Sequence, residues 1–168
     1  MHRMHTNETQ AWLADHDPLP VVALHDEVVD ALGHDPRSDY AETYWLPVIG
    51  PSSLWALRRL VGWLDASPAG YPVPLAPMAQ ELGLGEGTSR TAPLIRTLAR
   101  LVVFELAAVQ RDVLAVRRVV PPHAHRHVLR LPAHLAERHR VEVEAALRTT
   151  PATRHAAARG VEVEAAGR

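Results

Sequence analysis

The stretch that decides the fold is Thr91–Val119, TAPLIRTLARLVVFELAAVQRDVLAVRRV, where the spacing of the apolar residues changes along the chain. In its first part the apolar side chains fall within one arc roughly 120° wide, at about 100° per residue. After Val103 apolar residues alternate, and VFELAAVQ and VLAVRRV flank the dipeptide Arg111-Asp112. Because alternation is typical of strands and a two-residue loop is typical of hairpins, we predict a helix followed by a β-hairpin.

The sequence before this stretch predicts further elements in a recognisable order. Pro51–Ala66 is the clearest helix, with a proline in its first turn and a stripe of leucines. YPVPL is typical of a short strand, APMAQELGL of a two-turn helix and GLGEGTS of a turn. Thr91 is expected to cap the next helix, with Pro93 in its first turn. Helix, strand, helix, turn, helix and hairpin is the order of a winged helix-turn-helix domain.

We therefore predict a mainly α, α+β fold: a winged helix-turn-helix with a two-stranded β-hairpin wing and helical extensions at both ends. The expected organisation is an acidic helical extension at 1–50, the winged domain at 51–132, a C-terminal helix at 133–148 and an Ala-rich, loosely ordered tail at 149–168. In the extension, apolar residues at helical spacing predict a helix over Val21–Leu32. A short helix with Tyr40, Tyr44 and Trp45 is expected to end near Pro47.

Charge is distributed unevenly along the 168 residues, although the net charge is only −1. Residues 1–50 carry nine acids and two arginines, whereas residues 88–130 carry eight arginines and two acids. A basic segment of this density is what phosphate contact requires. All eighteen basic residues are arginines, whose planar fork suits phosphates and guanine edges. The alternative is that the acidic and basic halves pair with each other inside one fold.

The predicted helix after the Gly-rich turn has one apolar face and one basic face. Arg96 and Arg100 lie opposite the apolar arc, and residues at the helix start are placed where free amides favour a phosphate. In a winged helix this element enters the major groove, where arginine can contact guanine or phosphate. The residues expected to contact DNA are Ser89, Arg90, Thr91, Arg96, Thr97 and Arg100 on the helix, and Arg111 and Arg117 in the wing.

These features predict a bacterial DNA-binding protein, either sequence-dependent or dominated by backbone contacts, that acts as a transcriptional regulator. The expected partners are double-stranded DNA and a second copy of the chain, because two half-sites raise affinity and selectivity. The dimer surface is expected at the N-terminal helices or the helix after Ala133. The alternative is a winged helix used for protein–protein interaction, in replication or in a larger complex, without direct DNA contact.

Four histidines crowd into PPHAHRHVLRLPAH, Pro121–His134, and raise the question of a metal site. His123 and His127 could bind zinc or nickel on a helix, with His134 or His139 as a third ligand. The chain has no cysteine, and no acid lies between Asp112 and Glu137. We therefore favour polar residues on the exposed side of a short helix, and we expect neither a metal nor a cofactor.

Other classes of protein receive little support. Gly-x-Ser-x-Gly, His-Glu-x-x-His and a phosphate-loop lysine are all missing from the sequence, so we do not expect an enzyme. No apolar run is long enough to span a membrane, and the first residues lack the apolar core of a signal peptide. A cytoplasmic location is expected.

The chain resembles a group of uncharacterised actinobacterial proteins with a winged helix-turn-helix domain. The resemblance rests on YAETYWLPVIGPSSLWALRRL, ELGLGEGTSRTAPLIRTLARLVVFELA and VLAVRRVVPPHAHRHVLRLPAHL, within roughly residues 38–138. YWLPVIGPSSLWALRRL is also similar to the first helix of replication-initiation proteins of the DnaD and DnaB loader type. The resemblance implies the fold but no reaction or ligand. Ala92 and Pro93 depart from groove-reading helices, which often carry polar side chains there.

Overall fold

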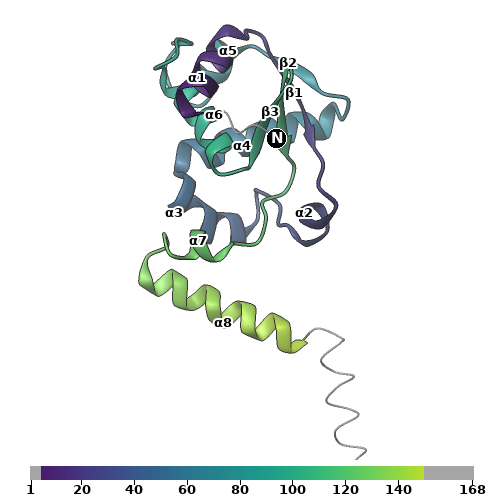
Figure 1. The fold of residues 1–168 in the computed structure, drawn as a ribbon, viewed down its shortest axis with the longest axis vertical. Helices are drawn as coiled ribbons and strands as arrows, with labels where there is room; N and C mark the ends of the chain where they lie inside the picture. The colour runs from purple at the N-terminus through teal and green to yellow at the C-terminus, as the bar shows by residue number, and fades with distance from the viewer. Residues whose placement is uncertain (1–4, 150–168) are drawn as a thin grey trace, which may run out of the picture. The chain divides into compact units, whose positions relative to one another are not determined.

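The computed structural model describes residues 5–149 and divides the chain into two compact units, 1–123 and 124–168. The fold is α+β, with helices around a mixed four-stranded sheet (Figure 1). The first unit contains α1 (Thr6–Asp15), β1 (Leu19–Leu24), α2 (Glu27–Leu32), the π-helical turn η1 (Ala41–Trp45), α3 (Leu46–Ile49), α4 (Pro51–Ala66), β2 (Tyr71–Val73), α5 (Leu75–Glu81), α6 (Pro93–Val103), β3 (Ala107–Gln110) and β4 (Val113–Arg117). The second contains α7 (His125–Val128) and α8 (Ala133–Thr149).

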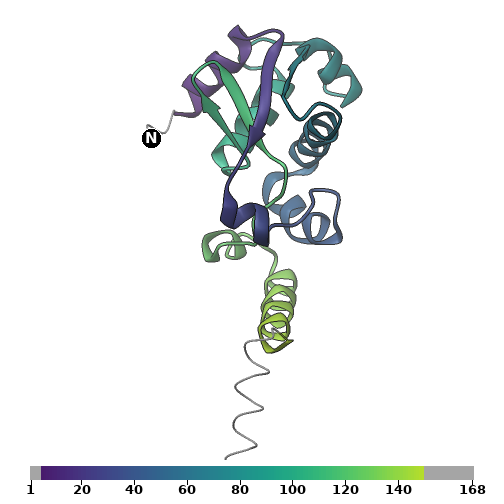
Figure 2. The same cartoon turned by 90° about the vertical axis from the view of Figure 1, so that its right-hand side faces the viewer.

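The sheet has the strand order β2-β1-β4-β3. The predicted hairpin is confirmed, since β3 and β4 pair antiparallel and Gln110 faces Val113 across the turn. β1 lies between the hairpin and β2, parallel to β4 and antiparallel to β2 (Figure 2). The hairpin is therefore half of a mixed sheet and not a separate two-stranded wing.

The predicted helix over Val21–Leu32 is wrong in its first part, because residues up to Leu24 form β1 and only Glu27–Leu32 is helical. The segment LPVVAL is a continuous apolar run, and such short runs suit a helix or an interior strand equally well. β1 is an interior strand with a neighbour on each side. Residues 1–50 therefore contribute to the sheet and are not an entirely helical extension.

The helices predicted at Pro51 and Ala133 are confirmed, and α4 ends at Ala66 as expected. α6 begins one residue later than Thr91 predicted, since its N-cap is Ala92. It also continues to Val103, so β3 starts only at Ala107. Leu106 N–H donates to Leu101 C=O (2.9 Å), and Glu105 N–H donates to Val102 C=O (3.1 Å). These two bonds form a Schellman motif, which ends the helix and turns the chain into the hairpin.

The core of the first unit lies between α4, α6 and the sheet. The leucine stripe of α4 and the apolar arc of α6 are buried, and the two helices pack against each other. Burying one such leucine contributes about 1.5–3 kcal/mol. Polar groups of the core are bonded as well: Trp45 Nε1–H donates to the carbonyl of Pro121 (3.0 Å), and the Tyr71 hydroxyl donates to the carbonyl of Leu60 (3.2 Å). Burial raises the pKa of the Tyr71 hydroxyl.

The second unit is described only as far as α8. Along α8, ion pairs three or four residues apart join Arg138 to Glu142 and Arg140 to Glu137 and Glu144. Pairs of opposite charge at this spacing favour the helical conformation. The tail predicted at 149–168 lies outside the described residues except for Thr149, the last residue of α8. None of the helices between residues 5 and 149 is long and apolar enough to cross a membrane.

Candidate nucleic-acid interface

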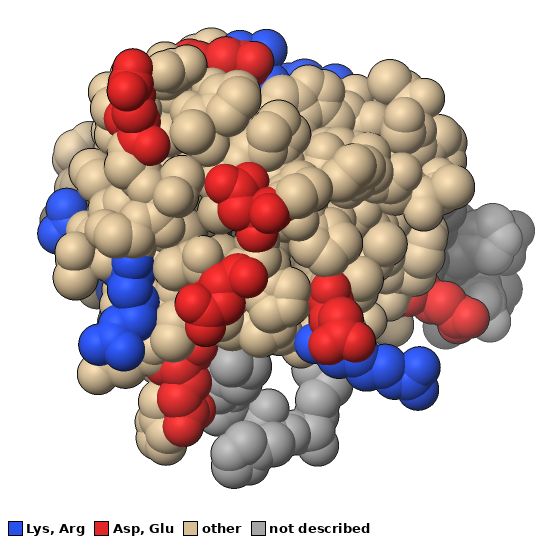
Figure 3. All heavy atoms as spheres, turned by 90° about the horizontal axis from the view of Figure 1, so that it is seen from above, with Lys and Arg blue, Asp and Glu red and all other residues tan. Residues whose placement is uncertain are grey.

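Charge is not evenly spread over the face of the first unit on which α1 and α5 lie. Figure 3 shows this face with Asp and Glu side chains across its middle and Arg side chains toward its margin. A phosphate backbone would be repelled from the middle of this face. A nucleic-acid surface must therefore be sought where arginines lack acidic neighbours.

α6 exposes one narrow stripe to solvent. Its exposed residues are Pro93, Arg96, Arg100 and Val103, which fall within roughly 80° at about 100° per residue. The buried residues are Leu94, Ile95, Thr97, Leu98, Ala99 and Leu101. The buried arc is wider than the sequence predicted, because Thr97 and Ala99 are covered too. α1 packs along α6 and was not predicted.

The two arginines predicted on the exposed face of α6 are both there, but they differ in how they are held. Arg100 donates from Nη2 to the carbonyl of Val48 (2.9 Å), and its guanidinium lies 5.3 Å from the centre of the Phe104 ring. The Arg96 backbone N–H donates to the carbonyl of Ala92 (3.1 Å), but its side chain makes no hydrogen bond or ion pair with any residue that the structure describes. All N–H donors of the Arg96 guanidinium are therefore available to a ligand, whereas one of those of Arg100 is already bonded to Val48.

The polar residues predicted at the start of α6 lie in the loop that precedes it. Ser89, Arg90 and Thr91 are exposed, and Ala92 N–H donates to the carbonyl of Ser89 (2.8 Å). Thr97 is different, because its exposed fraction is only 8%. A side chain that is this buried cannot reach a duplex. The predicted contact of Thr97 with DNA is therefore not supported.

The two arginines predicted to contact DNA from the hairpin differ in their exposure and in their partners. Arg111 is exposed in the two-residue turn. Its backbone φ of 52° lies in a region that residues other than glycine rarely adopt. Arg117 has a side chain only 15% exposed, and it donates to the carbonyl of Glu105 (2.8 Å) and to Asp26 Oδ2 (3.1 Å). Arg117 thus links β4 to the segment after β1. Its side chain has no free donor group on the surface, so the structure does not support its predicted contact with DNA.

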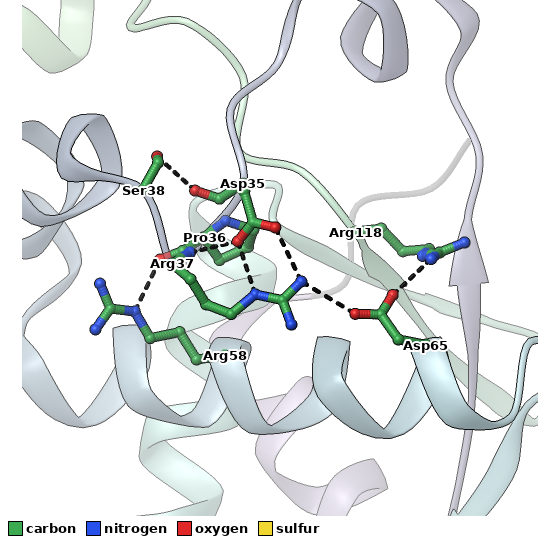
Figure 4. A network of polar contacts seen from close by, with 7 residues as sticks. All are labelled: Asp35, Pro36, Arg37, Ser38, Arg58, Asp65 and Arg118. Atoms are coloured by element: carbon green, nitrogen blue, oxygen red, sulfur yellow. Dashed lines mark hydrogen bonds and ion pairs between the residues drawn. The ribbon is translucent and has the colours of Figure 1, made fainter.

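Arg118 belongs to a polar network that joins three segments (Figure 4). Arg37 donates to both carboxylate oxygens of Asp35 and to Asp65 Oδ2 (3.0 Å), and Arg118 donates to the other oxygen of Asp65. Arg58 donates from Nε to the carbonyl of Pro36 (2.8 Å). The network connects the loop before η1, helix α4 and the end of β4, which is an intramolecular pairing of the acidic and basic parts.

The same network predicts a fall in stability in acid. The hydrogen bond from Arg37 lowers the pKa of Asp35, and the hydrogen bond from Arg118 lowers that of Asp65. Asp in the unfolded chain titrates near pH 3.9. The contribution of these two carboxylates to the free energy of unfolding is therefore complete above about pH 5, and it is lost as the pH falls through their lowered pKa values. We expect the free energy of unfolding, measured with urea between pH 2.5 and 6, to fall less steeply with decreasing pH for Asp65→Asn than for the native chain. The exposed control Asp39→Asn should retain the native slope, and equal slopes for all three would contradict the prediction.

The arginines of residues 5–123 divide into two groups by their partners. Those with a carboxylate partner are Arg37, Arg58, Arg59, Arg117 and Arg118. Those with no carboxylate partner among the described residues are Arg90, Arg96, Arg100 and Arg111. All four of the second group lie in α6, in the loop before it or in the hairpin turn. The sequence could not separate the two groups, because the partners of Arg117 and Arg118 come from distant segments.

The histidines of Pro121–His134 are not equivalent. His123 is buried in the first unit, with Nε2 2.8 Å from the carbonyl oxygen of Tyr44 and its ring 4.5 Å from that of Trp45. His127 is buried too, whereas His125 is exposed. The prediction of a uniformly exposed set is therefore wrong. Within residues 5–149, no three His, Asp or Glu side chains come together as a set that could hold a metal ion.

No protein-family model, curated protein or solved structure matches this chain. Its function is therefore inferred from its own residues.

Proposed function

We propose that the chain binds double-stranded DNA through a winged helix-turn-helix unit formed by α4, β2, α5, α6 and the β3–β4 hairpin. α6 is the helix that faces the duplex, and the hairpin turn is the wing. The order of elements supports the proposal, because a helix, a strand, two helices and a hairpin follow one another in this unit. β1 is an addition to that pattern.

The observation that carries the proposal is the grouping of arginines. Every arginine without a carboxylate partner in the described first unit lies in the segments that would contact DNA. An arginine already paired with a carboxylate must give up that pairing to bind phosphate, whereas Arg90, Arg96 and Arg111 need not. The exposed stripe of α6 offers few other polar groups, so we expect mainly backbone contacts. A transcriptional regulator is the cellular role we propose for such binding.

The test removes two of these arginines together. Arg96→Ala/Arg111→Ala should weaken binding of a duplex of about 20 base pairs at low salt by tenfold or more, roughly, and reduce the slope of log affinity against log salt by about 1.8. Fluorescence anisotropy at several salt concentrations measures both quantities. The matched control is Arg59→Ala/Arg138→Ala, which removes two exposed arginines that have carboxylate partners. If both variants weaken binding equally, the named arginines are not the contact surface.

A protein-interaction module is the second candidate function, and exposed apolar side chains favour it. Val103 is 47% exposed on the same stripe of α6 as Arg96, and Trp55 is 58% exposed on α4. A heparin column at low salt separates the two candidates, because a DNA-binding surface is retained and an apolar one is not. The homodimer stays a prediction. Its surface is still expected at the N-terminal helices or at the helix after Ala133.

A further inference from the structure

We infer that α1 is a displaceable acidic cover on α6. It limits DNA binding while it lies on α6, and the affinity of the chain for DNA rises when it leaves. The inference rests on the proposed function, since it assigns a regulator to the same surface. The sequence indicated the acidic charge of residues 1–50, but it predicted no helix at Thr6–Asp15 and no contact with α6.

Packing is the first observation. α1 lies along α6, the helix proposed to face the duplex, and it buries Thr9 and Leu13 (Figures 1 and 2). Thr97, which the sequence placed on the DNA-contacting face, is buried in the same structure, as is Ala99. The exposed stripe of α6 is narrow because α1 packs against this helix in addition to α4 and α5.

Charge is the second observation. Between Thr6 and Asp15, α1 carries Glu8 and Asp15 and no arginine, and both acids are exposed. Packed helices have axes about 8–10 Å apart, which is close to the Debye length of about 8 Å at physiological salt. The charges of α1 are therefore within range of a phosphate backbone that approaches α6, and they repel it.

The attachment of α1 is the third observation. Only two of its side chains, Thr9 and Leu13, are fully buried. Beyond the helix, Asp17 Oδ1 accepts a hydrogen bond from Leu75 N–H (3.1 Å) at the start of α5. The chain then enters β1, which is paired on both sides. Leu13 is fully buried on α6, so detachment of α1 has a cost, but the sheet and the contact of α4 with α6 do not include α1 and are expected to stay intact.

The first experiment changes the charge of α1 without loosening it. Glu8→Gln/Asp15→Asn should tighten DNA binding by about fivefold at low salt, because two charges near α6 are removed. Gln at position 8 can still accept the hydrogen bond from His5 N–H. The matched control is Glu27→Gln/Asp39→Asn, which removes two exposed acids from other parts of the first unit. It should change the affinity by less than about twofold.

The second experiment asks whether α1 leaves α6 when DNA binds. Hydrogen exchange of the full chain should show faster exchange of α1 amides on addition of a duplex, with α4 amides unchanged. Leu13→Ala should weaken the attachment, giving faster α1 exchange without DNA and tighter DNA binding. Unchanged protection of α4 in this variant shows that the core is still folded.

The outcomes distinguish this inference from the proposed function. If Arg96→Ala/Arg111→Ala binds DNA like the native chain, the proposed function fails. If DNA binding depends on those arginines but the α1 charge variant matches its control, or α1 amides become more protected with DNA, only the cover is disproved. Tighter binding of both α1 variants, together with faster α1 exchange, supports it.

Discussion

Gly70→Ala is expected to lower the free energy of unfolding by about 3–5 kcal/mol, because positive φ and overpacking both oppose the new side chain. Gly70 has a φ of +97° directly before β2. A Cβ atom at this position would lie 2.6 Å from the carbonyl oxygen of Val21 and 2.9 Å from a methyl carbon of Val22. The carbonyl belongs to β1, which cannot move away without losing its pairing with β4.

The control for this prediction is Gly62→Ala. Gly62 lies inside α4, and a Cβ atom there would meet nothing within 4 Å. Alanine should therefore stabilise the protein by about 0.5–1 kcal/mol, through its higher helix propensity. Urea unfolding followed by circular dichroism measures both changes. Equal effects at the two positions would contradict the close approach of β1 to the turn before β2.

His123→Ala should lower the free energy of unfolding by about 3 kcal/mol, the cost typical of removing a buried ring and a buried hydrogen-bond partner. The imidazole packs against Trp45 and bonds to the carbonyl of Tyr44, and the backbone N–H of His123 donates to the Tyr40 hydroxyl (2.9 Å). Alanine leaves the space unfilled and removes the bond to Tyr44.

His125→Ala is the matched control, two residues further along the chain. His125 is exposed at the start of α7, so its replacement should change stability by no more than about 0.5 kcal/mol. Thermal unfolding of both variants, monitored by tryptophan fluorescence, makes the comparison. A small loss at His123 would mean that its ring is not part of the core.

Several elements of the fold could be predicted from the sequence because each leaves a periodic signal. α4 has apolar residues at helical spacing and a proline in its first turn, and the hairpin has alternation around a two-residue turn. β1 could not be recognised, because an interior strand is apolar on both faces and shows no alternation. α1 left almost no signal, since only Thr9 and Leu13 of its ten residues are fully buried.

For the residues of the candidate site, the sequence predicted exposure correctly at some positions and wrongly at others. Arg90, Arg96 and Arg111 are exposed where the sequence placed them. Arg117 was assigned to DNA contact because it follows the hairpin turn, yet its partner Asp26 comes from the segment after β1. A contact between segments this far apart in the sequence has no local pattern. The same holds for Thr97, whose burial depends on tertiary packing and not on its position along α6.

The position of β1 in the sheet has a consequence for how the protein can be divided. A fragment that starts at Pro51 would keep every element of the proposed winged helix, but β2 and β4 would no longer have the strand that joins them. Both would present unpaired backbone groups along newly exposed edges, which favour aggregation. Fragments that begin before Leu19 should stay monodisperse, while those that begin after Leu24 should precipitate or pair with other chains. The smallest separately folding piece of this protein therefore reaches back into its acidic N-terminal segment.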